Sequence, residues 1–211
     1  MSKTLYTANI GGYDSLQEPE TITPGWNYIC YSDRPIQSKT WDVRIVAPIY
    51  GPVKTARAIK ILHRQYVPDG TSVWMDASMT PCGDLNEFLM RYHYGTFVIP
   101  AHPERTCLYE EAKVCKQIGK DIPGIIDEQT HGYRLDGFPA GAGLVASGII
   151  IRSADHNSFS RAWWNEVFRK SCRDQISFPY VAKHHDLDYM VMPFDEVTSE
   201  FFRWKSLHPV S

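Results

Sequence analysis

Short apolar runs alternate with helix-like segments along most of this 211-residue chain. Runs rich in β-branched and aromatic residues are typical of strands, and longer amphipathic segments are typical of helices. Such alternation favours a mainly parallel sheet whose strands are connected by helices. The pattern predicts strands at residues 5–8, 26–31, 41–46, 73–75, 96–100, 144–152 and 189–192, and helices at 52–67, 84–91, 107–118 and 159–173, with a shorter one near 125–129. We therefore expect one α/β domain over residues 1–211, with helices flanking the sheet.

The stretch from Val73 to Met79 is the most informative local sequence. Its apolar start is typical of a buried strand, and Asp76 comes where the apolar run stops. The small residues Ala77 and Ser78 follow and leave space beside the carboxylate. In an open α/β sheet, ligands bind just beyond the carboxyl ends of the strands. Asp76 is therefore a candidate to hold a divalent cation or a sugar hydroxyl, and an Asp that only caps the next turn is the alternative.

Two basic residues precede this stretch on a predicted helix. Pro52 stands at a favoured first-turn position, and a turn at residues 68–70 ends the helix. On a helical wheel, Arg57 and Lys60 share the side opposite the apolar residues. They could neutralise a diphosphate or orient Asp76, and a solvated helix face is the alternative.

Polar residues also follow the first predicted strand and the last predicted helix. The loop at residues 9–14 contains two adjacent glycines, which let backbone approach a ligand closely, although it is neither a GxGxxG motif nor a P-loop. Asp174 and Gln175 come directly after residue 173, and an ordinary polar helix end is the alternative there. Basic residues with a carboxylate suit a diphosphate, and Asp with Gln suits sugar hydroxyls. Together these groups predict a nucleotide-sugar site.

Charge and cysteine usage exclude several classes of protein. The formal net charge of −2 gives no overall basic field of the kind that drives nucleic-acid binding, although a local basic stripe stays open. Five Cys without C-x-x-C spacing argue against a disulfide framework and a structural zinc site. The first residues lack the apolar stretch of a signal peptide, and no run approaches the roughly 20 apolar residues that span a bilayer. We therefore expect a cytoplasmic protein with reduced thiols and no membrane span.

Short segments, in order over nearly the whole chain, carry a family resemblance. They are residues 6–14, 31–33, 54–62, 74–78, 84–88, 102–112, 137–139, 148–152 and 173–178. With them the chain resembles a glycosyltransferase-like family of TOD/MUCI type, once catalogued only as a domain of unknown function. That family is similar in turn to GT-A glycosyltransferases, above all the retaining family 8 type. The resemblance implies a single GT-A-like, Rossmann-like domain.

The resemblance also implies a metal site. In family 8 a DxD motif at the end of a central strand binds Mn²⁺ or Mg²⁺ with the donor diphosphate, and a late His completes the site. By that resemblance Asp76 and His208 would be the metal ligands, with His184 and His185 as further candidates. Ser78 stands where the motif has its second Asp. Either other ligands hold the metal, or the metal is not required.

The same resemblance implies roles for further residues. As the catalytic pair, Asp174 would bind donor sugar hydroxyls, and Gln175 would lie near the anomeric carbon. Arg105 and Glu110 would lie on the acceptor side. The donor-binding residues would be Ala8, Asn9, Gly11, Tyr13, Asp33, Arg57, Lys60, Asp76, Ser78, Ser147 and Gly148.

The sequence and the resemblance together predict a metal-assisted glycosyltransferase. It would move a hexose or pentose from a nucleotide sugar, in the first place a UDP-sugar, to a hydroxyl acceptor, with the metal as Lewis acid. The acceptor would be a glycan or, in a phage, a hydroxymethylated DNA base. A non-catalytic nucleotide-sugar or sugar-binding module is the alternative, because the DxD motif is incomplete. A two-carboxylate hydrolase has no motif to support it.

Overall fold

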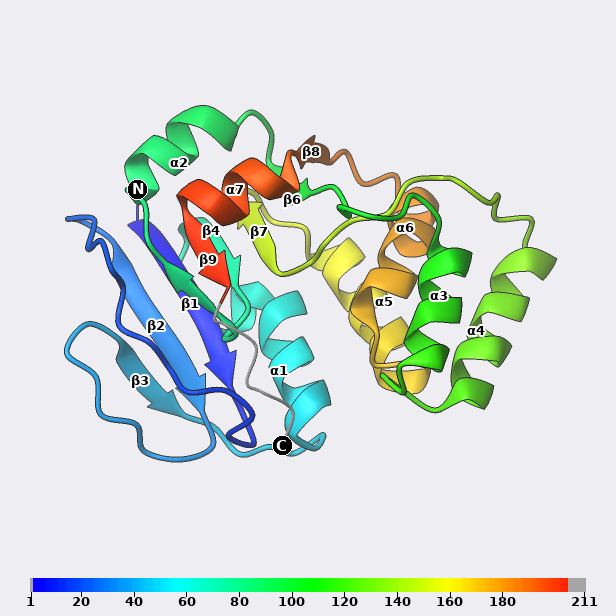
Figure 1. Ribbon diagram of the computed structural model, residues 1–211, viewed down its shortest axis with the longest axis horizontal. Coiled ribbons are helices and arrows are strands. Elements are labelled where there is room, and N and C mark those ends of the chain that lie inside the picture. The colour runs from blue at the N-terminus through cyan, green and yellow to red at the C-terminus, as the bar shows by residue number, and fades with distance from the viewer. Residues whose placement is uncertain (1, 205–211) are drawn as a thin grey trace.

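A seven-stranded sheet organises residues 2–204, the part of the chain that the computed structural model describes (Figure 1). The strands are β1 (Ser2–Asn9), β2 (Asn27–Ser32), β3 (Asp42–Ile45), β4 (Gly70–Met75), β6 (Phe97–Pro100), β7 (Ile149–Arg152) and β8 (Met190–Met192), with β5 (Met79–Pro81) and β9 (Phe202–Trp204) in a separate pair. Their order in the sheet is β3-β2-β1-β4-β7-β6-β8. All neighbours pair in parallel except β7, which is antiparallel to both β4 and β6. The predicted mainly parallel α/β fold is confirmed.

Helices cover the sheet and also form a group of their own. They are α1 (Pro52–Ile61), α2 (Leu85–Tyr92), α3 (Leu108–Gln117), α4 (Pro123–Leu135), α5 (Asn157–Arg169), α6 (Asp174–His184) and α7 (Phe194–Glu200), with a 3-10 turn η1 (His63–Gln65). In Figure 1, α3, α4, α5 and α6 stand together on the right, and α1 lies between them and β1.

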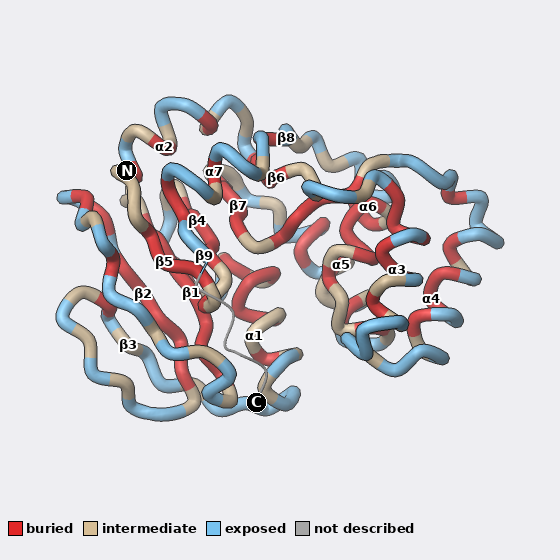
Figure 2. Tube along the Cα trace, in the orientation of Figure 1, coloured by how far each residue is buried: buried red, intermediate tan, exposed pale blue. Residues whose placement is uncertain are grey.

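Alternate strand residues pack into two different hydrophobic clusters, as the period of two along a strand requires. On β4, Trp74 belongs to a cluster with residues of α1 and α5, whereas Val73 and Met75 belong to one with residues of α2 and α7. Tyr6 and Leu5 on β1 divide in the same way. Figure 2 shows the inner strands as buried along their length. Burial on both faces explains why these strands are continuous apolar runs in the sequence.

Loops far apart in the sequence reach one edge of the sheet. β1 and β4 are parallel neighbours, so the loops that follow them leave at the same edge. Because β7 is antiparallel to β4, the loop before β7 lies there too, and the Asp76 N–H donates to the Gly148 carbonyl at 2.8 Å. The loop after β6 joins them through a bridge between Ala101 and Val145. This edge is where a ligand site is expected.

Several boundaries differ from the prediction. The helix that begins at Pro52 ends at Ile61 rather than near residue 67, because the chain leaves the helix at Leu62 and continues as a 3-10 turn. The apolar run at residues 144–152 is strand only from Ile149. The last part of the described chain contains α7 and β9, which its polar and aromatic composition did not reveal.

Asp174 begins a helix rather than following directly on the end of one. α5 ends at Arg169, and α6 starts at Asp174 although Pro179 stands inside it. Proline lacks the N–H donor and disfavours a helix interior, so the sequence pattern predicts no helix here. Asp174 therefore lies in a first helical turn, where the helix dipole favours negative charge.

All five cysteines are free, and three of them, Cys30, Cys107 and Cys115, are buried. This agrees with the expected reduced thiols. No helix within residues 2–204 combines the length and the apolarity needed to cross a bilayer.

Candidate active site

Two cavities open at this edge of the sheet and share one wall. The first, of about 180 Å³, lies between the loop after β1, the start of α1 and the end of β4. The second, of about 460 Å³, lies between the end of β4, the loops after β6 and before β7, and the start of α6. Arg57, Asp76 and Ser78 line both cavities. These three residues form the junction at which a ligand could extend from one cavity into the other.

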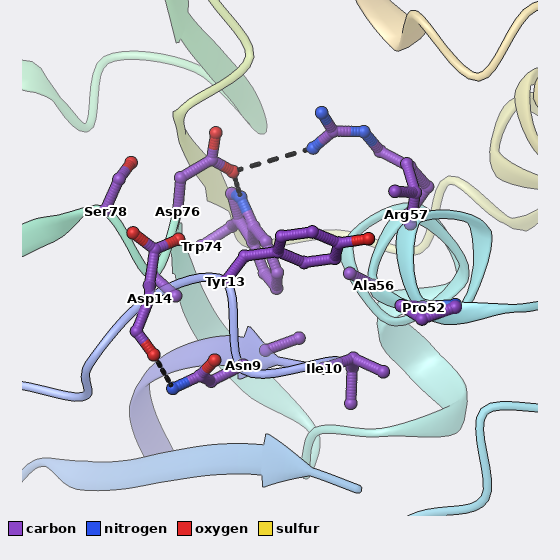
Figure 3. Close-up of a pocket in the computed structure, with 13 residues that line it drawn as sticks. Asn9, Ile10, Tyr13, Asp14, Pro52, Ala56, Arg57, Trp74, Asp76 and Ser78 are labelled. Carbon is purple, nitrogen blue, oxygen red and sulfur yellow. Dashed lines mark hydrogen bonds and ion pairs between the residues drawn. The ribbon is translucent and has the colours of Figure 1, made fainter. Parts of the chain in front are cut away.

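The loop after β1 forms a wall of the first cavity (Figure 3). Gly11 has a φ of 80°, which side chains rarely allow, and its N–H donates to Asp33 Oδ2 at 3.1 Å. Asn9 Nδ2 donates to the Asp14 carbonyl at 2.8 Å and closes the loop. Figure 3 shows the Tyr13 ring extending from this loop toward α1. The loop therefore has a fixed curvature that brings backbone and an aromatic ring to the cavity.

Two cations and two carboxylates meet at the junction and directly behind it. Lys60 is fully buried, and its Nζ lies 2.9 Å from Asp174 Oδ2 and 3.1 Å from Asp76 Oδ1. Arg57 Nε lies 3.4 Å from Asp174 Oδ1, and its Nη1 lies 3.9 Å from Asp76 Oδ1. Ser147 Oγ donates to Asp174 Oδ2 at 2.8 Å. Arg57 and Lys60 are three residues apart on α1 and reach the same partners, so they do not form a solvated helix face.

Burial and ion pairing act in opposite directions on this cluster. Burial alone would raise the pKa of Asp174, but attraction to Arg57 and Lys60 outweighs it and holds this pKa below its ordinary range. Burial lowers the pKa of Lys60 and repulsion from Arg57 lowers it further, although Asp174 and Asp76 oppose the shift. Asp174 is therefore charged at neutral pH, and its charge holds both cations in place.

Asp76 has one carboxylate oxygen engaged inside the protein and one that faces the cavities. The Trp74 indole N–H donates to Oδ1 at 2.8 Å, and Lys60 and Arg57 approach the same oxygen. Figure 3 shows the other oxygen without a partner among the residues that line the first cavity. No three His, Cys, Asp or Glu side chains of residues 2–204 come together as a metal cage. Mn²⁺ or Mg²⁺ at Asp76 would therefore take further ligands from outside these side chains, such as water or phosphate oxygens, a mode common for Mg²⁺.

Gln175 faces the second cavity, whereas its neighbour Asp174 does not. Gln175 Nε2 donates to the Val145 carbonyl at 3.1 Å, and its Oε1 accepts from Arg173 at 3.4 Å. These bonds hold the amide at the cavity wall. Asp174 is only 1% exposed and lines neither cavity. A sugar hydroxyl could reach Asp174 only after the ion cluster rearranged, and this predicted contact stays a prediction.

The loop after β6 brings a histidine and an arginine to the second cavity. His102 Nδ1 accepts the backbone N–H groups of Glu104 and Arg105, both at 3.2 Å. The other ring nitrogen, Nε2, lies 3.3 Å from Arg105 Nη2 and 3.6 Å from Glu111 Oε2, and burial lowers the pKa of His102. Both ring nitrogens of His102 are thus already engaged within the protein, which leaves no free nitrogen for a substrate. Arg105 Nε donates to the buried Glu111 at 2.8 Å, which fixes the guanidinium at the cavity.

The structure brings together most of the residues predicted to bind donor and acceptor. Lys60 and Asp174 stand behind the cavities, and Gly11 and Asp33 shape the loop without lining a cavity. The predicted residues that line a cavity are Ala8, Asn9 and Tyr13 in the first, Arg105, Ser147, Gly148 and Gln175 in the second, and Arg57, Asp76 and Ser78 in both.

Other predicted residues stand apart from the cavities. Glu110 is exposed on α3 and lines neither cavity. His184 and His185 lie at the far end of α6 from Asp174. His208 lies outside the described residues.

Some cavity residues carry no sequence signal of their own. Lys120 follows α3 in a loop, and Phe194 and Trp204 belong to α7 and β9, which the pattern did not predict. His102 lies within a segment of the family resemblance, which was the available signal. The cavity residues not predicted as site residues include Asp14, Pro52, Val53 and Trp74 in the first cavity, and His102, Lys120, Arg173, Phe194 and Trp204 in the second.

Two comparisons with known proteins bear on this site. A family model described as "TOD1/MUCI70, glycosyltransferase-like domain" matches residues 41–207, which include Arg57, Asp76 and Ser78. The chain is also similar to an Arabidopsis thaliana protein named "Probable hexosyltransferase MUCI70", with 30% identity over 136 residues. That match covers 57% of this chain and 23% of the plant protein, so the chain spans less than a quarter of that relative's length.

Proposed function

Because this chain belongs to the TOD1/MUCI70 family of glycosyltransferase-like domains, we propose that it transfers a hexosyl group from a nucleotide sugar to a hydroxyl acceptor. The observation that carries the proposal is the wall shared by two cavities, where Arg57 and Asp76 are paired with the buried Lys60 and Asp174. A nucleotide sugar has its diphosphate between nucleoside and sugar. Two cavities that meet at a cation suit this layout, with the nucleoside in the first and the sugar in the second.

Arg57 would make the direct charge contact with the diphosphate. Its side chain is 17% exposed and lines both cavities, whereas Lys60 is fully buried. A cation already held in place stabilises the negative charge that develops on the leaving diphosphate without further reorganisation. Lys60 and Asp174 would act as positioning residues, because they hold Arg57 and Asp76 at the junction.

Gln175 would act closest to the transferred sugar. Its amide lines the second cavity and is oriented by Val145 and Arg173. Glycosyl transfer develops positive charge at the anomeric carbon, so a polar group beside that carbon stabilises the transition state more than the ground state.

Asp76 would hold Mn²⁺ or Mg²⁺ together with the donor diphosphate, through the oxygen that faces the cavities. The ion would supply positive charge to the leaving group. Ser78, which lines the same two cavities, adds a hydroxyl but no second carboxylate.

A non-catalytic nucleotide-sugar or sugar-binding module is the second candidate. Ser78 in place of a second Asp, and a His102 ring with no free nitrogen, favour it. Of the acceptors, we propose a glycan over a hydroxymethylated DNA base, because the net charge of −2 gives little attraction to DNA.

The test is to incubate the protein with UDP-, GDP- and ADP-hexoses, with Mn²⁺ or with EDTA, and to follow donor hydrolysis. We expect hydrolysis of a UDP-hexose and tighter UDP binding with Mn²⁺. Arg57→Ala should weaken UDP binding by roughly 1–3 kcal/mol, because a charge-assisted bond is lost. Lys54→Ala is the matched control, since Lys54 lies on the same helix, donates to the Phe168 carbonyl at 2.7 Å and lines neither cavity.

Each part of the proposal can fail separately. Donor binding without turnover under any condition would support the binding module. An Arg57→Ala protein that binds UDP like the parent would remove the diphosphate contact. Equal UDP affinity with Mn²⁺ and with EDTA would remove the metal from Asp76.

A further inference from the structure

We propose that Lys120 and Arg173 form an anion subsite in the second cavity, which binds the carboxylate or phosphate of an acidic sugar. The inference rests on the proposed function and adds the charge class of the substrate. Either the transferred sugar or the acceptor, both of which would meet in this cavity, is acidic.

Cations outnumber carboxylates on the wall of the second cavity. Two of the cations are neutralised locally, since Arg57 pairs with Asp174 and Arg105 pairs with both Glu104 and Glu111. The charged residues of this wall are Arg57, Arg105, Lys120 and Arg173 against Asp76 and Glu104.

Lys120 and Arg173 lack such partners. Neither forms an ion pair with a carboxylate of residues 2–204. Arg173 Nε is buried without a hydrogen-bond partner among these residues, and the Arg173 bond to Gln175 Oε1 is long at 3.4 Å. Arg173 helps to lower the pKa of Asp174 by electrostatic attraction, without a hydrogen bond to it. Because Arg173 lines the second cavity and has no carboxylate partner, its guanidinium can donate to an anion there.

An acidic residue outside the cavity holds the two cations near one another. Asp121, next to Lys120, accepts hydrogen bonds at 2.8 Å from Ser171 Oγ and from the Cys172 N–H. Its other oxygen accepts the following backbone N–H at 2.8 Å. These bonds tie the loop after α3 to the loop before α6, so the subsite exists before a ligand binds. Because both Asp121 oxygens are engaged in this way, Asp121 does not form an ion pair with Lys120 or Arg173.

The same cavity also presents an aromatic surface for a sugar ring. Phe194 and Trp204 line it, with ring centroids 6.4 Å apart, and Trp204 is 45% exposed. Apolar and aromatic walls with a few placed charges are typical of small-molecule sites. A sugar ring against these aromatics, with its acidic group at Lys120 and Arg173, would use both features.

An acidic saccharide fits these residues better than the donor diphosphate or DNA does. The diphosphate has Arg57 at the junction, whereas Lys120 and Arg173 line only the second cavity. DNA binding requires a basic surface that follows many phosphates. Lys120, which is exposed, and Arg173, which is half-buried, line one cavity and do not supply such a surface.

Calorimetric binding to the full chain tests the inference in two arms. The donor arm compares UDP-glucuronic acid with UDP-glucose. The acceptor arm compares a glucuronic-acid-containing oligosaccharide with its carboxyl-reduced, neutral form on UDP-saturated protein. We expect the acidic probe to bind at least about tenfold more tightly in one arm, because a charge-assisted bond is gained. The arm with the preference identifies the acidic partner, and added salt should reduce the preference.

Variants assign the preference to the subsite. Lys120→Ala and Arg173→Gln should each reduce the acidic-to-neutral affinity ratio about tenfold. Lys113→Ala, an exposed lysine on α3 that lines neither cavity, should keep the parent ratio. Melting temperatures of the same preparations exclude loss of folded protein.

The inference is overturned by equal binding of acidic and neutral probes in both arms. A preference that survives Lys120→Ala and Arg173→Gln also overturns it, as does tighter binding of a hydroxymethylcytosine duplex than of either oligosaccharide. If UDP binds and UDP-glucose is hydrolysed without any charge preference, the inference fails and the proposed function stands. If no nucleotide sugar binds, the proposed function itself fails.

Discussion

At the residue scale, the charges that prepare the candidate site also hold the fold together. Lys60 is fully buried between Asp174 and Asp76, so each charge relies on the others for compensation. Removing one partner of a buried pair typically costs about 3–5 kcal/mol, because the remaining charge is left unpaired. Substitutions in this cluster therefore need a stability measurement beside every activity measurement.

Asp174→Asn should flatten the acid dependence of stability. The pKa of Asp174 lies below its ordinary range in the folded protein. Its charged form therefore stabilises the fold above the unfolded-state pKa of about 3.9, and this contribution is lost as pH falls through the folded-state pKa. We expect the parent's free energy of unfolding to fall steeply below about pH 4, and that of Asp174→Asn to be lower at pH 7 but to fall less. Urea unfolding at a series of pH values measures both; parallel curves would contradict the ion pairing.

Gln175→Ala should lower kcat on the order of tenfold or more and leave the donor KM nearly unchanged, since the amide would act mainly in the transition state. The measurement is donor hydrolysis, with the melting temperature taken on the same preparation. A purely structural Gln175 would give a lower melting temperature and full activity per folded molecule.

Single residues differ in how far sequence reasoning could place them. Asp76 was found because its carboxylate directly follows an apolar run and because parallel strands end at one edge. The helical wheel put Lys60 on the polar side of its helix, yet Lys60 is buried. A wheel shows which residues share a face, but not that α5 packs against α1 and that Asp174 comes from another helix to meet the cation.

At the element scale, strongly patterned segments were predicted and weakly patterned ones were not. The strands β1, β2, β4 and β6 were predicted because each is a short apolar run bounded by turn-forming residues. The helix α6 contains Pro179, and the short α7 and β9 have too few residues for a period to be recognised. The second cavity is built partly from these three elements, so its aromatic wall could not be predicted.

Asp84→Ala should destabilise the protein without changing the site. Asp84 caps α2, and its Oδ1 accepts the N–H groups of Asn86 at 2.8 Å and Glu87 at 2.9 Å. Loss of such a cap typically costs about 1 kcal/mol. Urea unfolding measures the loss, and UDP binding should be unchanged because Asp84 lines neither cavity. Weaker UDP binding at equal folded concentration would show that α2 is coupled to the site.

At the scale of the whole molecule, strand pairing decides where the site can form. A periodic sequence shows that strands exist but not which of them are neighbours, and the antiparallel β7 between β4 and β6 could not be predicted. This reversal matters for function, because it brings the loop with Ser147 and Gly148 to the same edge as Asp76. Both cavities are thus lined by loops at the edge of the sheet together with the first turn of a helix, α1 for the first cavity and α6 for the second.

Hydrogen exchange should distinguish the two cavities if nucleoside and sugar occupy them separately. UDP alone should slow amide exchange in residues 8–14 and 52–57, which border the first cavity. A non-hydrolysable UDP-hexose should add protection in residues 102–105 and 173–175, because its sugar would close contacts in the second. Helix α2 lines neither cavity and serves as the internal control. If UDP alone protects the segments of both cavities equally, the nucleotide spans both cavities, and the sugar must be placed elsewhere.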